Sequence, residues 1–138
     1  MGGGSGAGPT WHGASGVQGH STNTRTTDPE VIEKRTQVLV RKYEIRENTG
    51  GDGEWKGGDG VTREIEARMD LRFSILSERR VYSPYGMEGG GDGSVGRNFW
   101  IRRTEGEDGV VKEQKISLGG KAVVDVKKGD RLQINTPG

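Results

Sequence analysis

The sequence predicts a mainly β fold, in which antiparallel strands alternate with glycine-rich loops and one short helix lies near residues 29-35. The regular segments are short, alternate between apolar and polar residues and are rich in β-branched side chains, as in half-buried strands. Glycine supplies 26 of the 138 residues, and Gly-Gly-Asp-Gly occurs at residues 50–53, 57–60 and 90–93. Because Asp-Gly favours the positive φ angles of tight hairpin turns, we expect these sites, and Asp108-Gly109, to be turns. Calcium-binding repeats do not fit, because they require a regular nonapeptide spacing.

The first 35 residues predict a loop followed by the helix. Residues 1–27 are rich in Gly, Ser and Thr and, taken alone, predict a flexible leader. They also contain Trp11 and His12, which a plain linker does not need. Asp28 is placed to cap a helix that has Pro29 at its first position and ends near Arg35.

The strands are expected in the remaining sequence. Leu71, Phe73 and Ile75 alternate with polar residues, and Phe99 and Ile101 lie opposite Trp100. The segment 127–130 contains Gly129 and predicts a turn before the last strand. The expected strands are residues 38–46, 61–68, 71–75, 98–102, 110–118, 121–126 and 131–135.

The apolar content is low for a self-contained domain. Hydrophobic residues make up 28% of the chain, whereas globular domains reach about 45–50% with glycine counted. Ordered glycines also lose more backbone freedom than other residues do. Either much of the chain is loose, or protein outside this chain completes its core, and we favour the second interpretation.

Charge and cysteine content narrow the class of function. The net charge is +1, with 21 basic against 20 acidic residues, so no broad field attracts nucleic acid or an anionic membrane. The chain has no cysteine, which fits a cytoplasmic setting and excludes a thiolate nucleophile or metal ligand. No apolar run approaches the roughly 18 residues of a membrane span.

One glycine motif suggests nucleotide binding but lies in the wrong context. Residues 91–96 match G-x-G-x-x-G, a fingerprint that is meaningful only between a strand and a helix. A strand is expected at 98–102, so no helix N-terminus is available for a pyrophosphate. The sequence therefore predicts no ATP site within this chain.

Two sets of side chains could form a site. His12 and His20 are suited to general base catalysis or metal binding, or they are exposed histidines with local hydrogen bonds. The segment 77–87 holds charged and aromatic residues on a turn that contains Pro84 and Gly86. Arg79 or Arg80 could clamp a carboxylate or phosphate, or Glu78 could simply pair with one of them. Adjacent strand residues face opposite sides, so only one arginine can enter a given cleft.

These motifs resemble the C-terminal end of ATP-dependent 5-oxoprolinases, in the hydantoinase B/oxoprolinase family. The most specific pieces are Trp11-His12-Gly13, Thr22-Asn23-Thr24-Arg25 and Ser77-Glu78-Arg79-Arg80. Further matching pieces lie in order at residues 6–10, 28–30, 33–35, 57–61, 84–87, 89–90, 118–121, 129–130 and 136–138. The resemblance extends over nearly the whole chain. It implies that residues 1-138 of this chain are the C-terminal part of a hydantoinase B/oxoprolinase domain and a terminal piece of a larger α+β protein, with a Gly/Ser/Thr-rich, site-like loop at 1-27 and a β-rich region at 28-138.

The resemblance implies ATP-dependent hydrolysis of 5-oxo-L-proline to L-glutamate, a step of glutathione metabolism. Phosphorylation of the lactam oxygen activates a reluctant amide for attack by water. In the family, ATP and magnesium belong to a hydantoinase A-like half, and hydrolysis belongs to the hydantoinase B-like half. The hydantoinase A-like half and the N-terminal part of the hydantoinase B-like half are missing from this chain. We therefore expect the chain to be a truncated fragment that is inactive alone.

Side-chain chemistry then suggests roles for individual residues. We expect an arginine to bind the substrate carboxylate, and His12 or Glu78 to handle protons. The expected substrate-binding residues are Asn23, Arg25, Arg79, Arg80, Tyr82 and Tyr85. Two alternatives remain: a non-catalytic standalone β binding module, and a small subunit of a hydantoinase-type complex.

Overall fold

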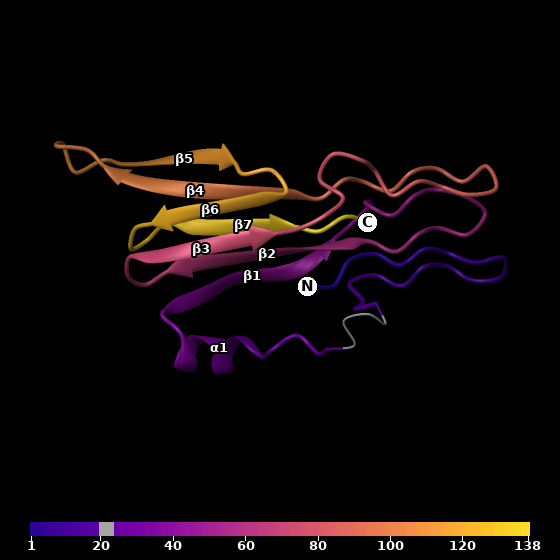
Figure 1. The fold of residues 1–138 in the computed structure, drawn as a ribbon, viewed down its shortest axis with the longest axis horizontal. Helices are drawn as coiled ribbons and strands as arrows, with labels where there is room; N and C mark the ends of the chain where they lie inside the picture. The colour runs from indigo at the N-terminus through magenta and orange to yellow at the C-terminus, as the bar shows by residue number, and fades with distance from the viewer. Residues whose placement is uncertain (20–23) are drawn as a thin grey trace.

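The computed structural model describes residues 1–19 and 24–138. One short helix, α1 (Pro29–Arg35), precedes β1 (Val38–Arg46), β2 (Gly60–Ala67), β3 (Leu71–Leu76), β4 (Arg97–Glu105), β5 (Val111–Ser117), β6 (Lys121–Val126) and β7 (Arg131–Asn135), as Figure 1 shows. The mainly β, antiparallel fold expected from the sequence is confirmed.

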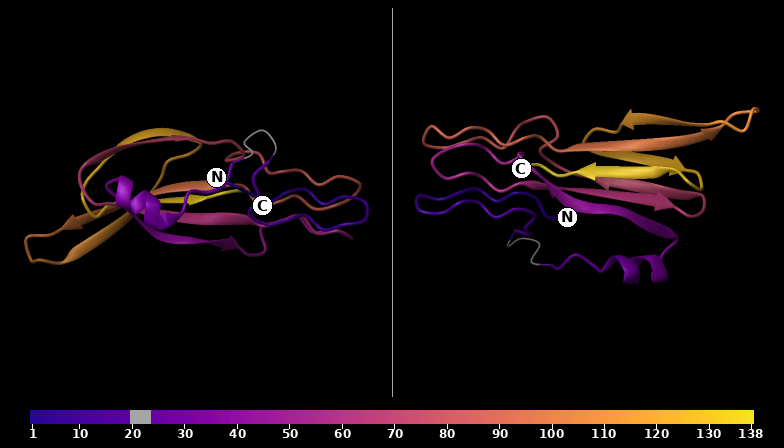
Figure 2. Two further views of the ribbon diagram at one scale, coloured as in Figure 1. Left: turned by 90° about the horizontal axis from the view of Figure 1, so that it is seen from below. Right: turned by 180° about the vertical axis from the view of Figure 1, so that it is seen from behind.

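The strands form two layers. The larger sheet has the order β1-β2-β7-β4-β5, and β3 pairs with β6 in a second sheet of two strands. All paired strands are antiparallel. Figure 2 shows the β3–β6 pair over one face of the larger sheet, with α1 beside β1. The buried core lies mainly between the layers and includes Val61, Ala67, Val126 and Leu132.

Local sequence accounts for the helix. The Asp28 carboxylate accepts a hydrogen bond from the Glu30 amide at 2.8 Å, and Pro29 begins the first turn. The Thr36 amide and hydroxyl both donate to the Ile32 carbonyl, which ends the helix. The predicted and observed bounds are the same.

The strand bounds follow the alternating pattern closely. The first and the last two strands agree with expectation, and β4 continues to Glu105, three residues beyond its predicted end. This extension has no apolar alternation, because β4 and β5 form a hairpin in which Glu105 pairs with Val111. Cross-strand hydrogen bonds therefore support polar residues that the pattern did not include.

The prediction of tight turns at the Asp-Gly sites is wrong for three of the four. Gly109 has a positive φ of 74°, and the turn at Gly129 is also confirmed, with φ 89°. Gly53, Gly60 and Gly93 do not have positive φ. At Gly60 and Gly93 the reason for glycine is space: an added Cβ would lie 2.3 Å from the Thr136 oxygen and 2.4 Å from the Gly138 oxygen.

Many of the glycines lie in three loops that pack side by side. We call residues 2–17, 47–59 and 84–95 the first, second and third glycine loops; they extend together beyond the ends of the strands (Figure 1). The first and second loops are joined by the amides of Gly13 and Gly58, which donate to Lys56 and Ser5 oxygens at 2.8 and 2.9 Å. The Ser94 amide joins the third loop to the Thr49 oxygen of the second at 2.8 Å. Residues 2–17 are thus a paired hairpin, and the expectation of a flexible leader is wrong there.

Candidate functional site

His12 lies at the outer end of the first glycine loop. Its Nδ1 accepts a hydrogen bond from the Lys56 amide at 2.9 Å, and its ring centroid is 5.2 Å from that of Trp55. A neutral imidazole that accepts through Nδ1 carries its proton on Nε2. In this arrangement the Nε2–H of His12 faces solvent as a hydrogen-bond donor. The lone pair of Nδ1 already accepts from Lys56, so Nδ1 cannot act as a base.

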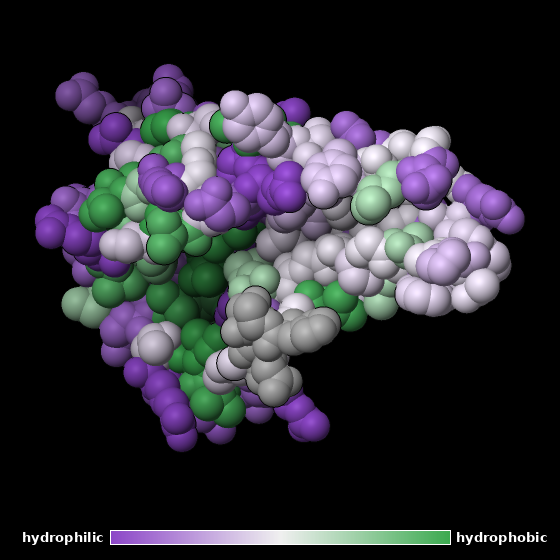
Figure 3. Space-filling view, turned by 45° about the vertical axis from the view of Figure 1, so that its right-hand side comes forward, coloured by the Kyte–Doolittle hydropathy of each residue, from purple (hydrophilic) through white to green (hydrophobic). Residues whose placement is uncertain are grey.

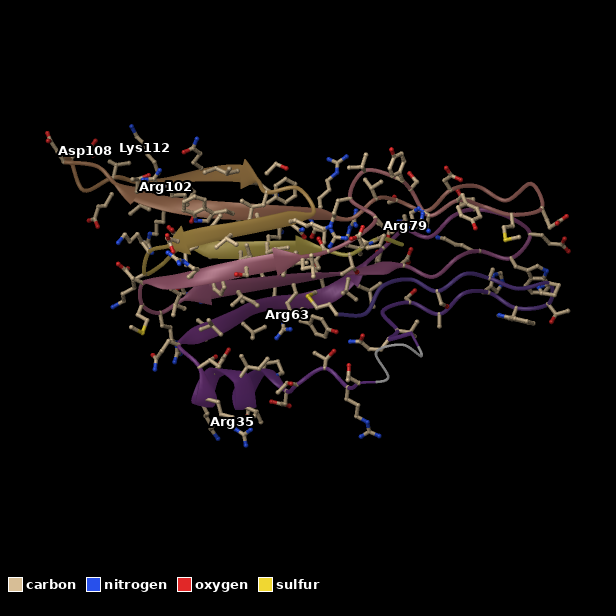
Figure 4. All side chains as sticks on the ribbon, viewed as in Figure 1. Arg35, Arg63, Arg79, Arg102, Asp108 and Lys112 are labelled. Carbon is tan, nitrogen blue, oxygen red and sulfur yellow. The ribbon has the colours of Figure 1, made fainter. Side chains whose placement is uncertain are left out.

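The segment after β3 carries most of the other predicted site residues. Arg79 adopts φ 57°, and its guanidinium carbon lies 5.9 Å from the centre of the Tyr85 ring. Tyr82 and Tyr85 are both exposed. The Glu78 carboxylate is exposed and lies 3.7 Å from the Lys121 ammonium. Figure 4 shows Arg79 near the junction between the sheets and the glycine loops.

Arg80 points inward instead. Its Nε and Nη2 donate to the Asn98 side-chain oxygen at 3.3 and 3.2 Å, and its Nη1 donates to the Glu78 carbonyl at 2.5 Å. Burial lowers the pKa of Arg80, and the nearby positive charge of Arg46 adds to this. Arg80 is half-buried and Arg79 exposed. The cause is not strand alternation, because β3 ends at Leu76 and Arg79 has a positive φ.

Asn98 holds Arg80 in place. Its side chain is 1% exposed, and its amide nitrogen donates to the Ser77 hydroxyl and the Gly119 carbonyl, both at 2.8 Å. The sequence predicts no role for Asn98, because an asparagine at the start of a strand is common and its partners are distant in the sequence.

The structure divides the predicted site residues into separate groups. Glu78, Arg79, Arg80, Tyr82 and Tyr85 share one segment, whereas His12 directly follows the Gly8–Trp11 bridge at the outer end of the first glycine loop. Arg25 is exposed in the stretch before α1. His20 and Asn23 lie outside the described residues. The roles suggested for all these residues remain predictions.

Arg46 and Arg97 were not predicted from the sequence, yet both lie close to this segment. Arg46 ends β1, and its Nη1 donates to the carbonyls of Val95 and Thr136 at 3.3 and 2.5 Å. Burial lowers the pKa of Arg46, with a smaller contribution from the charge of Arg97. Both arginines stand at the ends of strands, which could have indicated a shared site. That indication can be used only when the order of the strands in the sheet is known.

Asp59 fixes the second glycine loop from within. Its Oδ1 accepts hydrogen bonds from the amides of Gly50 and Thr49, each at 2.8 Å. These two backbone donors, the Gly50 amide above all, hold the pKa of the Asp59 carboxyl below its usual value. The carboxylate therefore has a structural partner set and is not free for catalysis.

The nucleotide-like glycine motif lacks the helix that follows it in dinucleotide-binding folds. Residues 91–96 lead into β4, a strand, so no helix dipole faces the loop. Across residues 1–19 and 24–138, no group of three His, Cys, Asp or Glu side chains gathers to hold a metal ion. Within the same part of the chain, no helix is long and apolar enough to cross a bilayer.

The glycine loops and the sheets also differ in the hydropathy of their surfaces. Figure 3 shows the glycine loops as a pale projection of near-neutral hydropathy, next to sheets that carry strongly hydrophilic and hydrophobic side chains. The same view shows apolar side chains open to the surface in a hollow at the side of the sandwich. Together, fold and loops define a two-layered antiparallel β domain that carries a candidate site at the base of its glycine loops.

Comparisons with known proteins identify the family. The model of the hydantoinase B/oxoprolinase family matches residues 1–138, and the chain belongs to this family. It is 59% identical over its full length to a 5-oxoprolinase of Pestalotiopsis fici and 54% identical to 5-oxoprolinase 1 of Arabidopsis thaliana. It spans 10% of the length of each of these relatives.

A solved structure has the same fold. The ATP-dependent caprolactamase from Pseudomonas jessenii superposes with a TM-score of 0.67 and 18% sequence identity. The match covers 96% of this chain and 23% of the caprolactamase chain. The fold of this chain therefore occurs as one part of a larger polypeptide.

Proposed function

We propose that this chain is a part of a 5-oxoprolinase, which hydrolyses 5-oxo-L-proline to L-glutamate with ATP in the cytoplasm. The observation that carries the proposal is the 59% identity to a 5-oxoprolinase over all 138 residues. The similarity to the B-type component of a putative D-/L-hydantoinase from a Pseudomonas species is lower, at 36% over 68% of the chain. That match keeps a small subunit of a hydantoinase-type complex as the second candidate.

The partners of the chain in this proposal are the hydantoinase A-like and N-terminal hydantoinase B-like parts, in the same polypeptide or in a separate subunit. The length of the relatives and the apolar side chains open to the surface support such neighbours. The residues 91–96 do not fit ATP, so the proposal assigns ATP and magnesium to the other parts.

The chain would contribute to the binding of 5-oxo-L-proline. Its carboxylate suits an arginine, because a guanidinium offers two parallel N–H donors to two oxygens. Arg80 is held in place for this role by Asn98, the exposed Arg79 would add a second guanidinium, and Tyr82 and Tyr85 would form the adjoining wall. Of the two residues expected to handle protons, Glu78 shares the segment of the arginines, and the proposal assigns this role to its exposed carboxylate. The exposed Arg25 would supply a further donor.

A chimeric enzyme tests the proposal. In Arabidopsis 5-oxoprolinase 1, the matching segment is replaced by residues 1–138 of this chain, and 5-oxoproline-dependent ATP hydrolysis and glutamate release are measured. We expect the chimera to be active and the isolated 138-residue chain to be inactive. A chimera that is folded but inactive, beside an active parent, would contradict the proposal.

Variants of the chimera distinguish an effect on 5-oxoproline binding from an effect on folding. We expect Arg79→Gln to raise the KM for 5-oxoproline about tenfold, which corresponds to the loss of one charge-assisted contact. Arg35→Gln, on the exposed face of α1, is the matched control and should leave KM unchanged.

A further inference from the structure

Three consecutive residues at the start of β4 bring three arginines together. The Val95 carbonyl accepts from Arg46, which arrives from the end of β1. Gly96 lies against the Arg80 guanidinium, so closely that an added Cβ would be 2.3 Å from Nη1. Arg97 itself begins β4. The three side chains come from three separate strands or loops and converge at the end of the sheet where the glycine loops begin.

No carboxylate balances this group of charges among the described residues. Arg41, Arg72 and Arg131 each pair with an Asp or Glu at 3.0 Å or less, but Arg46, Arg80 and Arg97 form no ion pair in the described structure. The pKa of Arg46 and that of Arg80 are both lowered, by burial and by a neighbouring arginine. Half-buried cations without a counter-charge are unfavourable, so an anion at this place would be attracted.

The arginines also retain donors for such an anion. A guanidinium carries five N–H groups, and Arg46 uses only its Nη1 for the Val95 and Thr136 carbonyls. In the described part of the chain, its Nε and Nη2 have no protein partner and are not fully buried. The Arg97 side chain is exposed and donates no hydrogen bond to a described residue, so it opens the group to solvent.

We propose that Arg46, Arg80 and Arg97 form a binding site for a small oxyanion, a carboxylate or a phosphate, at the base of the glycine loops. Arg80 is positioned by Asn98, Arg46 by two backbone carbonyls, and Arg97 completes the site from the surface. Planar guanidinium forks match the geometry of both anions. Gly96 keeps the site open, because any larger residue would displace the Arg80 guanidinium. The inference rests on the geometry of this chain and does not require the parent protein to be a 5-oxoprolinase.

Titrations of the 138-residue chain test the site and distinguish the anion. Inorganic phosphate, 5-oxo-L-proline and the uncharged lactam 2-pyrrolidinone are added at constant ionic strength, and backbone amide shifts are followed by NMR. We expect saturable shifts of the amides at residues 95–98 with phosphate, with 5-oxo-L-proline, or with both, and none with 2-pyrrolidinone. Binding of phosphate alone would identify a phosphate site, and binding of 5-oxo-L-proline alone a carboxylate site. Equal shifts with all three compounds, or none with either anion, would overturn the proposal.

Arginine variants assign the binding to these side chains. Arg97→Gln removes a charge from an exposed side chain without described contacts, so it should keep the fold and weaken anion binding about tenfold. Arg46→Gln should weaken binding by a similar factor, while Arg35→Gln, far from the site, should bind as the wild type does (Figure 4). Unchanged affinity in folded Arg97→Gln, or equal loss in Arg35→Gln, would contradict the site. Because no step of catalysis is measured, failure here is distinct from failure of the chimera.

Discussion

Two buried polar side chains hold the ends of the strands in place. Asp130, 1% exposed, accepts hydrogen bonds from the Trp100 indole at 3.1 Å and from the amides of Arg103 and Lys127 at 2.8 and 3.0 Å. Asn98 plays the corresponding part at the opposite end of β4, where it joins Arg80, Ser77 and Gly119. Burial of each side chain is tolerated because every one of its polar atoms has a hydrogen-bond partner. Loss of the side chain would leave buried donors and acceptors unpaired, which costs free energy.

Removal of the Asn98 side chain tests this at the level of one residue. We expect Asn98→Ala to lower the free energy of unfolding by about 2–3 kcal/mol, since it leaves buried donors and acceptors without partners. Urea denaturation measures the change. Ser74→Ala, on the exposed face of β3, is the control and should change stability by less than about 0.5 kcal/mol. A similar effect of both variants would show that Asn98 is not an anchor.

Asp59 makes the second glycine loop sensitive to acid. Its pKa is depressed in the folded state, so its contribution to stability is present above the unfolded value of about 3.9 and is lost as pH falls through the lower folded value. We expect Asp59→Asn to be less stable than the wild type at pH 7, with the difference shrinking below about pH 4. Thermal unfolding across pH 2.5–7 measures it. A constant difference over that range would mean that ionisation of Asp59 does not stabilise the loop.

At the scale of elements, the glycine loops pack through their backbones. An added Cβ at Gly4 would lie 1.9 Å from the Gly58 oxygen, and one at Gly58 would lie 2.0 Å from the Ala14 oxygen. Loops that approach so closely have no space for side chains, and hydrogen bonds between amides and carbonyls take the place of a core. This explains how a chain with few apolar residues can support long loops.

Two glycine substitutions test whether a glycine is needed because the loop backbones approach each other closely or because it is flexible. Gly4→Ala should destabilise the first loop by about 1–3 kcal/mol through the clash with Gly58. Gly6→Ala, in the same loop with nothing within 4 Å of an added Cβ, should be neutral or stabilising by up to about 1 kcal/mol. Hydrogen exchange of the Gly13 and Gly58 amides, which join the first and second loops, reports the change. Equal exchange rates in the two variants would refute close packing as the reason for Gly4.

The sequence predicted the helix and strands well, but it said little about how these elements and the loops pack together. The cap of α1 and the alternation in β3 are local signals, and both gave the observed element. The glycine loops were misjudged because the residue that requires a glycine is distant in the sequence, as Gly58 is from Gly4. For the same reason Arg80 was predicted as a site residue from its own segment, whereas Arg46 could be found only once the strand order was known.

At the scale of the molecule, large apolar side chains are exposed at the end of β3, in the segment after it and on the paired strand β6. Leu76 and Val81 are 82% and 81% exposed, Tyr82 and Met87 are also exposed, and so is Val123 on β6. Such a group is characteristic of a surface that packs against other protein. It agrees with the small core and with a chain that corresponds to a tenth of its long relatives.

Charged residues at these positions test the role of the surface. We expect Leu76→Lys with Val81→Lys to change the free energy of unfolding of the isolated chain by less than about 0.5 kcal/mol, because both side chains are already in water. The same pair should lower binding of a hydrophobic dye and, in the chimera, reduce the yield of assembled enzyme. Ser74→Lys is the polar control on β3. A large loss of stability in the isolated chain would show instead that the two residues belong to its core.

The two ends of the chain lie against each other. The Gly4 amide donates to the Pro137 carbonyl at 3.1 Å, and the Gly138 amide donates to the Ser94 carbonyl at 3.2 Å. A short linker could therefore join residue 138 to residue 1, and new ends could be cut in the exposed β4–β5 hairpin at residues 106–109. Such a circular permutant would keep every strand pairing and every contact between the glycine loops, since the fold depends on which segments are neighbours and not on the point at which the chain starts.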